Sequence, residues 1–237
     1  CIKGCKNQDV RLSKAYLKEP KMTHEEWATK KVYFPSQDIS PILGYFKIKF
    51  SPQYKLLFKL MDRPDVHTLF AKWASQSGKS LFEMLIIGYR LDNEPANVLY
   101  MQPIKDDIPK VLRLKINPVL KCIKDLWQKF EDYIATEGIR SKDAIKQLAG
   151  GSLVVSGSSV KERKSLTVPL LVMDEIGEFD KGAVKEASER LKAFSKFFPK
   201  KIGVSTIVHP KDEICTNFEN CEAIMEWRYK CPNCKDN

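Results

Sequence analysis

Residues 67–80 read HTLFAKWASQSGKS, and residues 81–91 continue as LFEMLIIGYRL. The first six residues predict a short β-strand, and the apolar run, hydrophobic nearly all round, predicts a buried helix that begins at residue 79. Gly78, Lys79 and Ser80 lie at the junction. Such a turn is typical of a phosphate-binding loop, because the glycine leaves room for a phosphate and the helix N-terminus faces its negative charge.

The loop departs from the usual pattern at one position. In G-x-x-x-x-G-K-[ST] the first glycine falls at residue 73, which is Trp73 here. Backbone N–H groups of the loop would surround the β-phosphate, Lys79 would reach the β- and γ-phosphates, and the Ser80 hydroxyl would bind Mg²⁺. The candidate nucleotide-binding residues of this loop are Ser75, Gln76, Ser77, Gly78, Lys79 and Ser80. A Gly-Lys-Ser tripeptide alone is common by chance, so the prediction depends on a second motif.

The second motif is an acidic pair after another predicted strand. Residues 170–175 read LLVMDE, so a buried strand ends in Asp174 and Glu175. In P-loop ATPases an aspartate here holds the Mg²⁺ shell and a following glutamate activates the attacking water, which indicates ATP hydrolysis more than passive binding. Ser205 and Thr206 end the next predicted strand, where such enzymes can contact the γ-phosphate. An ordinary strand end explains these two residues equally well.

The rest of the chain alternates strand-like and helix-like runs. Strands are predicted at 67–72, 97–101, 152–156, 168–173 and 201–205, and helices at 53–61, 79–91, 107–133 with a break near Pro118, and 183–198. This order predicts an α/β fold of βαβ units with a mostly parallel sheet flanked by helices. We expect an N-terminal arm or lid over residues 1–50, with a short helix after a cap-like start at Thr23-His24-Glu25-Glu26, an ATPase domain over 51–210, and a linker over 211–237.

Composition narrows the class of protein. The 237 residues suffice for one large domain, and 43% hydrophobic with 30% charged residues argues against a disordered tail. No run approaches the roughly 20 apolar residues that a membrane span requires, so we expect a soluble globular protein without a membrane partner. The net charge of +10 favours polyanionic partners such as nucleic acid.

Positive charge is concentrated near the predicted helix 183–198. Residues 181–201 contain seven basic and two acidic side chains. The helix pattern places Val184, Ala187, Leu191, Phe194 and Phe198 on one buried face. Lys185, Lys192 and Lys196 would then project outward and contact the DNA backbone, although a solvated helix face is the commoner explanation of such a run.

The seven cysteines carry a second candidate site. Their odd number and the lack of an apolar targeting run at the start favour a reducing compartment over a disulfide scaffold. Cys231-Pro-Asn-Cys234 has the spacing of a zinc knuckle. Cys1, Cys5, Cys215 and Cys221 are candidate partners, but we expect a half-site that binds nothing in this chain, which ends inside the knuckle as a fragment of a longer protein would. Cys122 lies in a helical pattern and is expected in the core.

Together these blocks resemble the large subunit of the tailed-phage DNA-packaging terminase, in particular its lambda-like GpA branch. The resemblance rests on Met22-Thr-His-Glu-Glu-Trp27-Ala, Phe50-Ser-Pro-Gln53-Tyr, Ser75-Gln-Ser-Gly78-Lys79-Ser80, Met173-Asp174-Glu175, Ser205-Thr206 and Tyr229-Lys-Cys231-Pro-Asn-Cys234. Their order and spacing are more specific than any one block. Members of this family with a Walker A loop lacking the first glycine are familiar, so Trp73 agrees with the resemblance.

The resemblance implies a RecA-like ATPase of the ASCE type that uses ATP and Mg²⁺ to drive double-stranded DNA into a procapsid. It implies a homo-oligomeric ring, the portal protein and the small terminase subunit as partners, and the host cytoplasm as location. The endonuclease domain that follows in the full protein is not expected in this chain.

Three basic or polar positions are assigned only through the resemblance. Gln53 falls where the family has a glutamine that reads the adenine edge, although a surface residue opening a helix explains it equally well. Ser75 stands where the family has a basic residue, for which Lys72 is the nearest substitute. Arg163, with Lys164 second, falls where a basic side chain acts on a neighbouring subunit's γ-phosphate, and a solvated loop charge is the alternative.

Two other functions stay open. Another ASCE nucleic-acid motor, such as a helicase, would need a second RecA-like lobe, which 237 residues do not hold. A non-enzymatic zinc-ribbon DNA-binding or scaffold protein with a degenerate P-loop would bind ATP without turnover.

Overall fold

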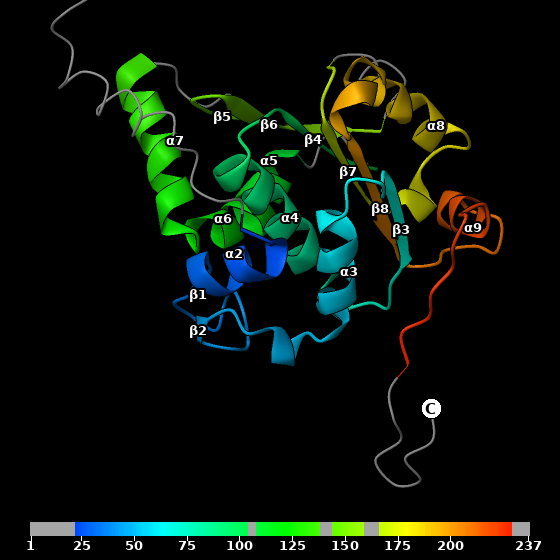
Figure 1. The fold of residues 1–237 in the computed structure, drawn as a ribbon, viewed down its shortest axis with the longest axis horizontal. Helices are drawn as coiled ribbons and strands as arrows, with labels where there is room; N and C mark the ends of the chain where they lie inside the picture. The colour runs from blue at the N-terminus through cyan, green and yellow to red at the C-terminus, as the bar shows by residue number, and fades with distance from the viewer. Residues whose placement is uncertain (1–21, 104–107, 138–143, 159–165, 229–237) are drawn as a thin grey trace, which may run out of the picture.

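A six-stranded sheet organises the chain in the computed structural model, which describes residues 22–103, 108–137, 144–158 and 166–228 (Figure 1). The strands follow the order β3 (Thr68–Lys72), β8 (Lys200–Ser205), β7 (Leu170–Asp174), β4 (Val98–Gln102), β6 (Gly151–Gly157) and β5 (Ile145–Leu148). Every neighbouring pair is parallel except β5 with β6. The predicted α/β fold with a mostly parallel sheet is confirmed.

The register of the parallel strands aligns their carboxyl ends. Lys72 lies opposite Ser205, Asp174 lies opposite Val204, and Gln102 lies opposite Gly157. The chain therefore leaves β3, β7 and β8 at one edge of the sheet, which is where ligands bind in open α/β sheets.

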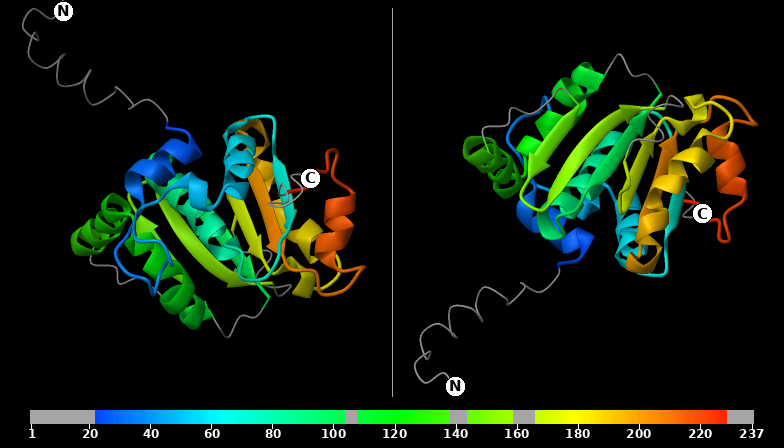
Figure 2. Two further views of the ribbon diagram at one scale, coloured as in Figure 1. Left: turned by 90° about the horizontal axis from the view of Figure 1, so that it is seen from below. Right: turned by 90° about the horizontal axis from the view of Figure 1, so that it is seen from above.

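Helices cover both faces of the sheet (Figures 1 and 2). One face carries α2 (His24–Lys31), α3 (Gln53–Asp62), α4 (Lys79–Asn93), α5 (Ile108–Val111), α6 (Asn117–Lys121) and α7 (Lys124–Glu137), and the other carries α8 (Ala183–Ser188) and α9 (Glu213–Glu219). Side chains of a strand alternate between the two layers: in β4, Val98 and Tyr100 pack in the first core, and Leu99 and Met101 pack in the second. No helix in the described part of the chain is long and apolar enough to cross a membrane.

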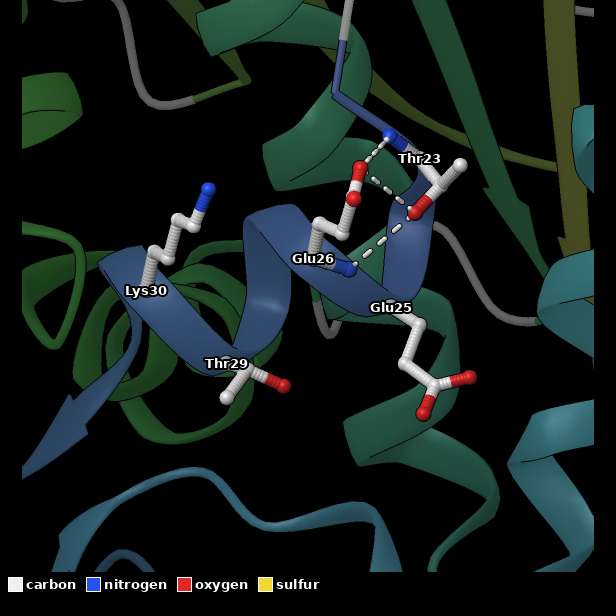
Figure 3. A pocket seen from close by; sticks show the side chains of 5 residues that line it. All are labelled: Thr23, Glu25, Glu26, Thr29 and Lys30. Carbon is white, nitrogen blue, oxygen red and sulfur yellow. Dashed lines mark hydrogen bonds between the residues drawn. The ribbon is translucent and has the colours of Figure 1, made fainter.

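The segment before α3 packs against the body of the molecule. Helix α2 begins with the predicted capping box: the Thr23 hydroxyl accepts from the Glu26 N–H at 3.3 Å, and the Glu26 carboxylate accepts from the Thr23 N–H at 2.9 Å (Figure 3). Trp27 is fully buried and donates its indole N–H to Asp92 of α4 at 2.8 Å. A two-stranded hairpin of β1 (Tyr33–Phe34) and β2 (Gly44–Tyr45) and the short 3₁₀-helix η1 (Ile48–Phe50) follow. The domain boundary at residue 50 stays a prediction.

The region predicted as one helix broken near Pro118 is divided differently. A π-helical turn, η2 (Leu112–Ile116), follows α5, and Pro118 lies in the first turn of α6 instead of at a break. The backbone before Pro118 is itself helical: Ile116 has φ of −84° and ψ of −56°, and the Asn117 N–H donates to the Leu112 carbonyl. The interruption comes instead at Cys122 and Ile123, between α6 and α7.

The predicted helix 183–198 is wrong in its second half. After α8 the chain continues as a 3₁₀-helix, η5 (Glu189–Phe197), and Phe198 is 59% exposed, not buried. A 3₁₀-helix has three residues per turn, so the apolar stripe written for 3.6 residues per turn is lost. Val184 and Ala187 are buried as expected. For the same reason Lys192 and Lys196 lie about 120° apart around the axis of η5.

Candidate nucleotide-binding site

The loop between β3 and α4 has the shape of a phosphate-binding loop. Gly78 has φ of 93°, the left-handed region, and a Cβ there would collide with the Tyr54 hydroxyl, which donates to the Gly78 carbonyl. The Ser77 carbonyl accepts from the Gln53 amide at 3.3 Å and from the Trp73 indole N–H at 3.2 Å. Trp73, which occupies the position of the motif's first glycine, therefore supports the loop through this hydrogen bond.

The outer part of the loop is open. Ser75 and Gln76 are exposed, and Gln76 has φ of 57°. The Ser77 hydroxyl closes the turn by donating to the Ala74 carbonyl at 2.6 Å. Ser80 is half-buried in the first turn of α4. The predicted loop residues thus lie at the N-terminus of α4, with Gln53 beside them.

Lys79 connects the loop to the acidic pair. Its Nζ lies 3.1 Å from Oδ1 of Asp174 and contacts Oε1 of Glu175. Burial alone would lower the pKa of Lys79, but the charges of Asp174 and Glu175 outweigh it and raise that pKa. Among the described residues neither Lys79 Nζ nor Asp174 Oδ1 makes a well-directed hydrogen bond. A buried amine and a buried carboxylate oxygen left in this state fit a site for phosphate and a divalent cation.

Asp174 is the buried centre of the acidic pair, at 5% exposed. Its Oδ2 accepts from the Tyr100 hydroxyl at 2.9 Å and contacts Nζ of Lys115. Burial would raise the pKa of Asp174, but Lys115 and Lys79 outweigh it and hold that pKa below its usual range. The side chain is therefore a carboxylate at neutral pH, as a ligand in the Mg²⁺ shell must be.

Glu175 is held by the residues that end β8. Its Oε2 accepts from the Ser205 hydroxyl at 3.4 Å, the Thr206 N–H at 3.4 Å and the Thr206 hydroxyl at 3.3 Å. The Gly177 N–H donates to the Ser205 hydroxyl at 3.0 Å. The backbone of Glu175 has φ of 50°, and its side chain is 32% exposed. A carboxylate oriented in this way can reach water and take up a proton.

The described residues also show which oxygens could hold a cation. They contain no cluster of three His, Cys, Asp or Glu side chains suited to a metal ion. Mg²⁺ in phosphate sites is bound by one or two protein oxygens together with the phosphates and water. Asp174 and Ser80 are the residues that would supply them.

Other predicted residues lie away from this site. Lys185, Lys192 and Lys196 are exposed on α8 and η5, and Lys192 pairs with Glu189. Lys72 is the nearest substitute for the family's basic residue. Its Nζ lies 4.6 Å from the ring centre of Phe218, a residue of α9. Cys122 and Cys215 are buried free thiols, and Cys221 is a half-buried one. Arg163, Lys164, Cys231 and Cys234 lie outside the described residues, and their roles stay predictions.

Three residues of the site were missed by sequence reasoning. Tyr100 lies in an apolar strand and read as core, and Lys115 lies in no motif. Glu83 is fully buried in α4, and Lys115 Nζ lies 3.5 Å from its Oε2. Burial and the neighbouring charge of Asp174 raise the pKa of Glu83 well above its usual range. A glutamate inside a helix that is otherwise apolar nearly all round was the signal that could have revealed it.

Known proteins share this fold and match this sequence. The family described as phage terminase large subunit gpA, ATPase domain, matches residues 40–237. The large terminase of bacteriophage HK97 superposes with a TM-score of 0.63 at 13% identity, over 84% of this chain and 40% of that chain. A mutant ATPase domain of the large terminase of Thermus phage P74-26 gives a TM-score of 0.49 at 13% identity, over 68% of this chain and 66% of that one.

This chain therefore spans about 40% of the length of the HK97 protein, which it resembles in fold. Comparison with curated proteins gave no match. The family match covers more than half of the chain and includes both the P-loop and the acidic pair. The chain belongs to the family of phage terminase large subunits of the gpA type, within their ATPase domain.

Proposed function

We propose that this chain hydrolyses ATP with Mg²⁺ and is the motor domain that moves double-stranded DNA into a procapsid. The observation that supports it most is the position of Lys79, which lies at the N-terminus of α4 between the two carboxylates that end β7. Its amine is the group that would contact the β- and γ-phosphates. Bound Mg²⁺ would supply charge neutralisation at those phosphates.

Each residue of the site has one role in this proposal. Gly78 and the loop backbone bind phosphate oxygens, and Gln53 stands beside the loop where it can contact the base. Asp174 and Ser80 hold the cation. Glu175 takes a proton from the attacking water, and Ser205 and Thr206 orient its carboxylate. A passive binder has no use for this last carboxylate, which is why hydrolysis is proposed and not binding alone.

Two substitutions separate these roles. Lys79→Ala is expected to remove most nucleotide binding, whereas Glu175→Gln is expected to preserve binding and abolish turnover, because water activation acts only in the transition state. Lys72→Ala is the control, since that lysine lies against α9. Binding is measured with a fluorescent ATP analogue, and turnover by phosphate release with and without DNA at concentrations that allow assembly.

The same experiment distinguishes the rival functions. Glu175→Gln with wild-type turnover would refute the catalytic role of that residue. A wild-type chain that binds ATP without turnover in every assembly state would instead support a DNA-binding or scaffold protein with a degenerate P-loop.

The partners follow from the family and from surface charge. We infer that Lys185, Lys192 and Lys196 contact the DNA backbone. We also infer a homo-oligomeric ring in which Arg163 acts on the nucleotide of a neighbouring subunit. The portal protein and the small terminase subunit are the proposed protein partners. The host cytoplasm is the proposed location, and Cys231 with Cys234 the proposed zinc half-site. We assign no nuclease activity to these residues.

A further inference from the structure

Lys115 enters the site from an unusual element. It lies in the π-helical turn η2, which is anchored by the buried side chains of Leu112 and Ile116. Single π-turns are rare and occur frequently at functional sites, because they change the direction in which a side chain leaves the helix. The Lys115 side chain is 24% exposed, and its amine contacts Oδ2 of Asp174.

The two oxygens of Asp174 have different surroundings. Oδ2 is bound from two sides, by Lys115 and by the Tyr100 hydroxyl at 2.9 Å. Oδ1 faces Lys79 at 3.1 Å and accepts no well-directed hydrogen bond from the described residues. Rotating the carboxylate would break both contacts of Oδ2, so these contacts keep Oδ1 directed toward the P-loop.

A structural role is the rival explanation. Lys115 could serve only to neutralise Glu83, which is fully buried and whose two oxygens lack a hydrogen-bond partner among the described residues. The distances favour Asp174, since Lys115 Nζ is in direct contact with its Oδ2 and is 3.5 Å from Glu83 Oε2.

We propose that Lys115 is a positioning residue that, together with Tyr100, holds Oδ2 of Asp174 so that Oδ1 is presented to the Mg²⁺ of a bound nucleotide. The proposal rests on the proposed function of the site. Within the described part of the chain the ion pairs of Lys115 are with carboxylates, not with phosphate-binding groups of the loop. Loss of Lys115 should therefore weaken the response to Mg²⁺ and leave magnesium-free nucleotide binding unchanged.

The test measures binding of a fluorescent ATP analogue to the full chain across a Mg²⁺ titration and in excess EDTA. Groups that orient a metal ligand typically change metal affinity 10- to 100-fold, so Lys115→Met should raise the half-saturating Mg²⁺ concentration about 10-fold or more. Affinity in EDTA should stay within about twofold. Tyr100→Phe should raise the half-saturating Mg²⁺ concentration by a smaller factor. Lys115→Arg should raise it less than Lys115→Met does. Lys110→Met, an exposed lysine of α5, is the matched control.

A double variant separates positioning from charge neutralisation. Lys115→Met removes the cation beside the buried Glu83 and leaves that carboxyl group without a polar partner among the described residues, so it is expected to lower the melting temperature. Adding Glu83→Met replaces the unpartnered carboxyl group with an apolar side chain of similar length and should restore stability while the Mg²⁺ midpoint stays shifted. If either the double variant or Lys115→Met has the wild-type half-saturating Mg²⁺ concentration, the role of Lys115 is refuted and the proposed function is not affected. A wild-type chain that binds no nucleotide in either condition would refute the proposed function and this inference with it.

Discussion

Gly78 joins the loop to the helix at a position where both backbone conformation and space exclude a side chain. Its φ of 93° lies in the left-handed region, and the Tyr54 hydroxyl occupies the volume where a Cβ would lie. Gly182 has a similar φ of 84° but nothing within 4 Å of its Cβ position. A side chain at Gly182 would therefore cause backbone strain alone, whereas a side chain at Gly78 would cause strain and a steric collision.

Alanine at each position should give different losses. A non-glycine residue in the left-handed region costs roughly 1–2 kcal/mol, so Gly182→Ala should lower the free energy of unfolding by about that amount. Gly78→Ala adds the collision with Tyr54, so it should cost more and also weaken nucleotide binding. Urea denaturation and a binding assay measure both effects. Equal losses in the two variants, with nucleotide binding intact, would contradict the described loop.

Residues in motifs were predictable, and residues placed only by tertiary contacts were not. Gly78, Lys79, Asp174 and Glu175 could be assigned because the chemistry of phosphate binding restricts both residue type and spacing. Lys115 reaches Asp174 across 59 residues of sequence, through a π-turn that no local pattern announces.

The loop from β8 to α9 is organised by one capping residue. Oδ1 of Asp212 accepts from the Cys215 N–H at 2.8 Å, and Oδ2 accepts from the N–H groups of Val208 at 2.9 Å and His209 at 3.1 Å. Partial burial would raise the pKa of Asp212, but these hydrogen bonds outweigh burial and hold that pKa below its usual range. Asp212 thus fixes the segment that follows Thr206.

The stability given by this carboxylate should depend on pH. Because the folded pKa of Asp212 is depressed, its contribution is present above the unfolded pKa of about 3.9 and is lost as pH falls through the folded value. Asp212→Asn should cost about 1 kcal/mol at pH 7, and the difference from wild type should shrink as the pH falls below about 4. Asp38→Asn, at an exposed position, should change stability by less than about 0.5 kcal/mol. Urea denaturation of wild type and variants at pH 7 and below about pH 4 measures this difference in the free energy of unfolding. A difference that does not change with pH would exclude the charge of Asp212 as its cause.

Elements with an apolar run or a capping motif were predictable, and short elements with neither were not. Helix α4 and the central strands β4 and β7 have nearly continuous apolar patterns, because they are buried on both sides. Strand β5 reads IKQL and pairs only at the sheet edge, so it carries no such pattern. The change from α8 to the 3₁₀-helix η5 depends on packing, which periodicity alone does not contain.

The two sides of the sheet divide the molecule between nucleotide support and proposed DNA contact. Helix α4 lies on one side of the sheet, and α8, which carries Lys185, lies on the other (Figure 1). Lys192 and Lys196 belong to η5, which follows α8 directly. Each phosphate that a lysine neutralises contributes about 0.9 to the log–log salt slope of binding to duplex DNA.

Replacing these three lysines with glutamine should make that slope shallower by up to roughly two units, because Lys192 and Lys196 point in different directions from η5, and should weaken binding similarly on unrelated sequences. The same change at Lys30, Lys59 and Lys124, exposed lysines on the other side of the sheet, removes equal charge and should affect the slope less. Stability should change little in either variant, because exposed charges contribute little to it. Identical slopes for wild type and both triple variants would place the DNA contact elsewhere.

A structure of the chain with Mg²⁺ and a non-hydrolysable ATP analogue tests the nucleotide site most directly. We expect the phosphates against the backbone N–H groups of residues 77–80, with Nζ of Lys79 moved from Asp174 and Glu175 to the phosphate oxygens. Lys115 should remain on Oδ2 of Asp174. A nucleotide bound elsewhere, with Lys79 still between the two carboxylates, would contradict the assignment of this loop as the ATP site.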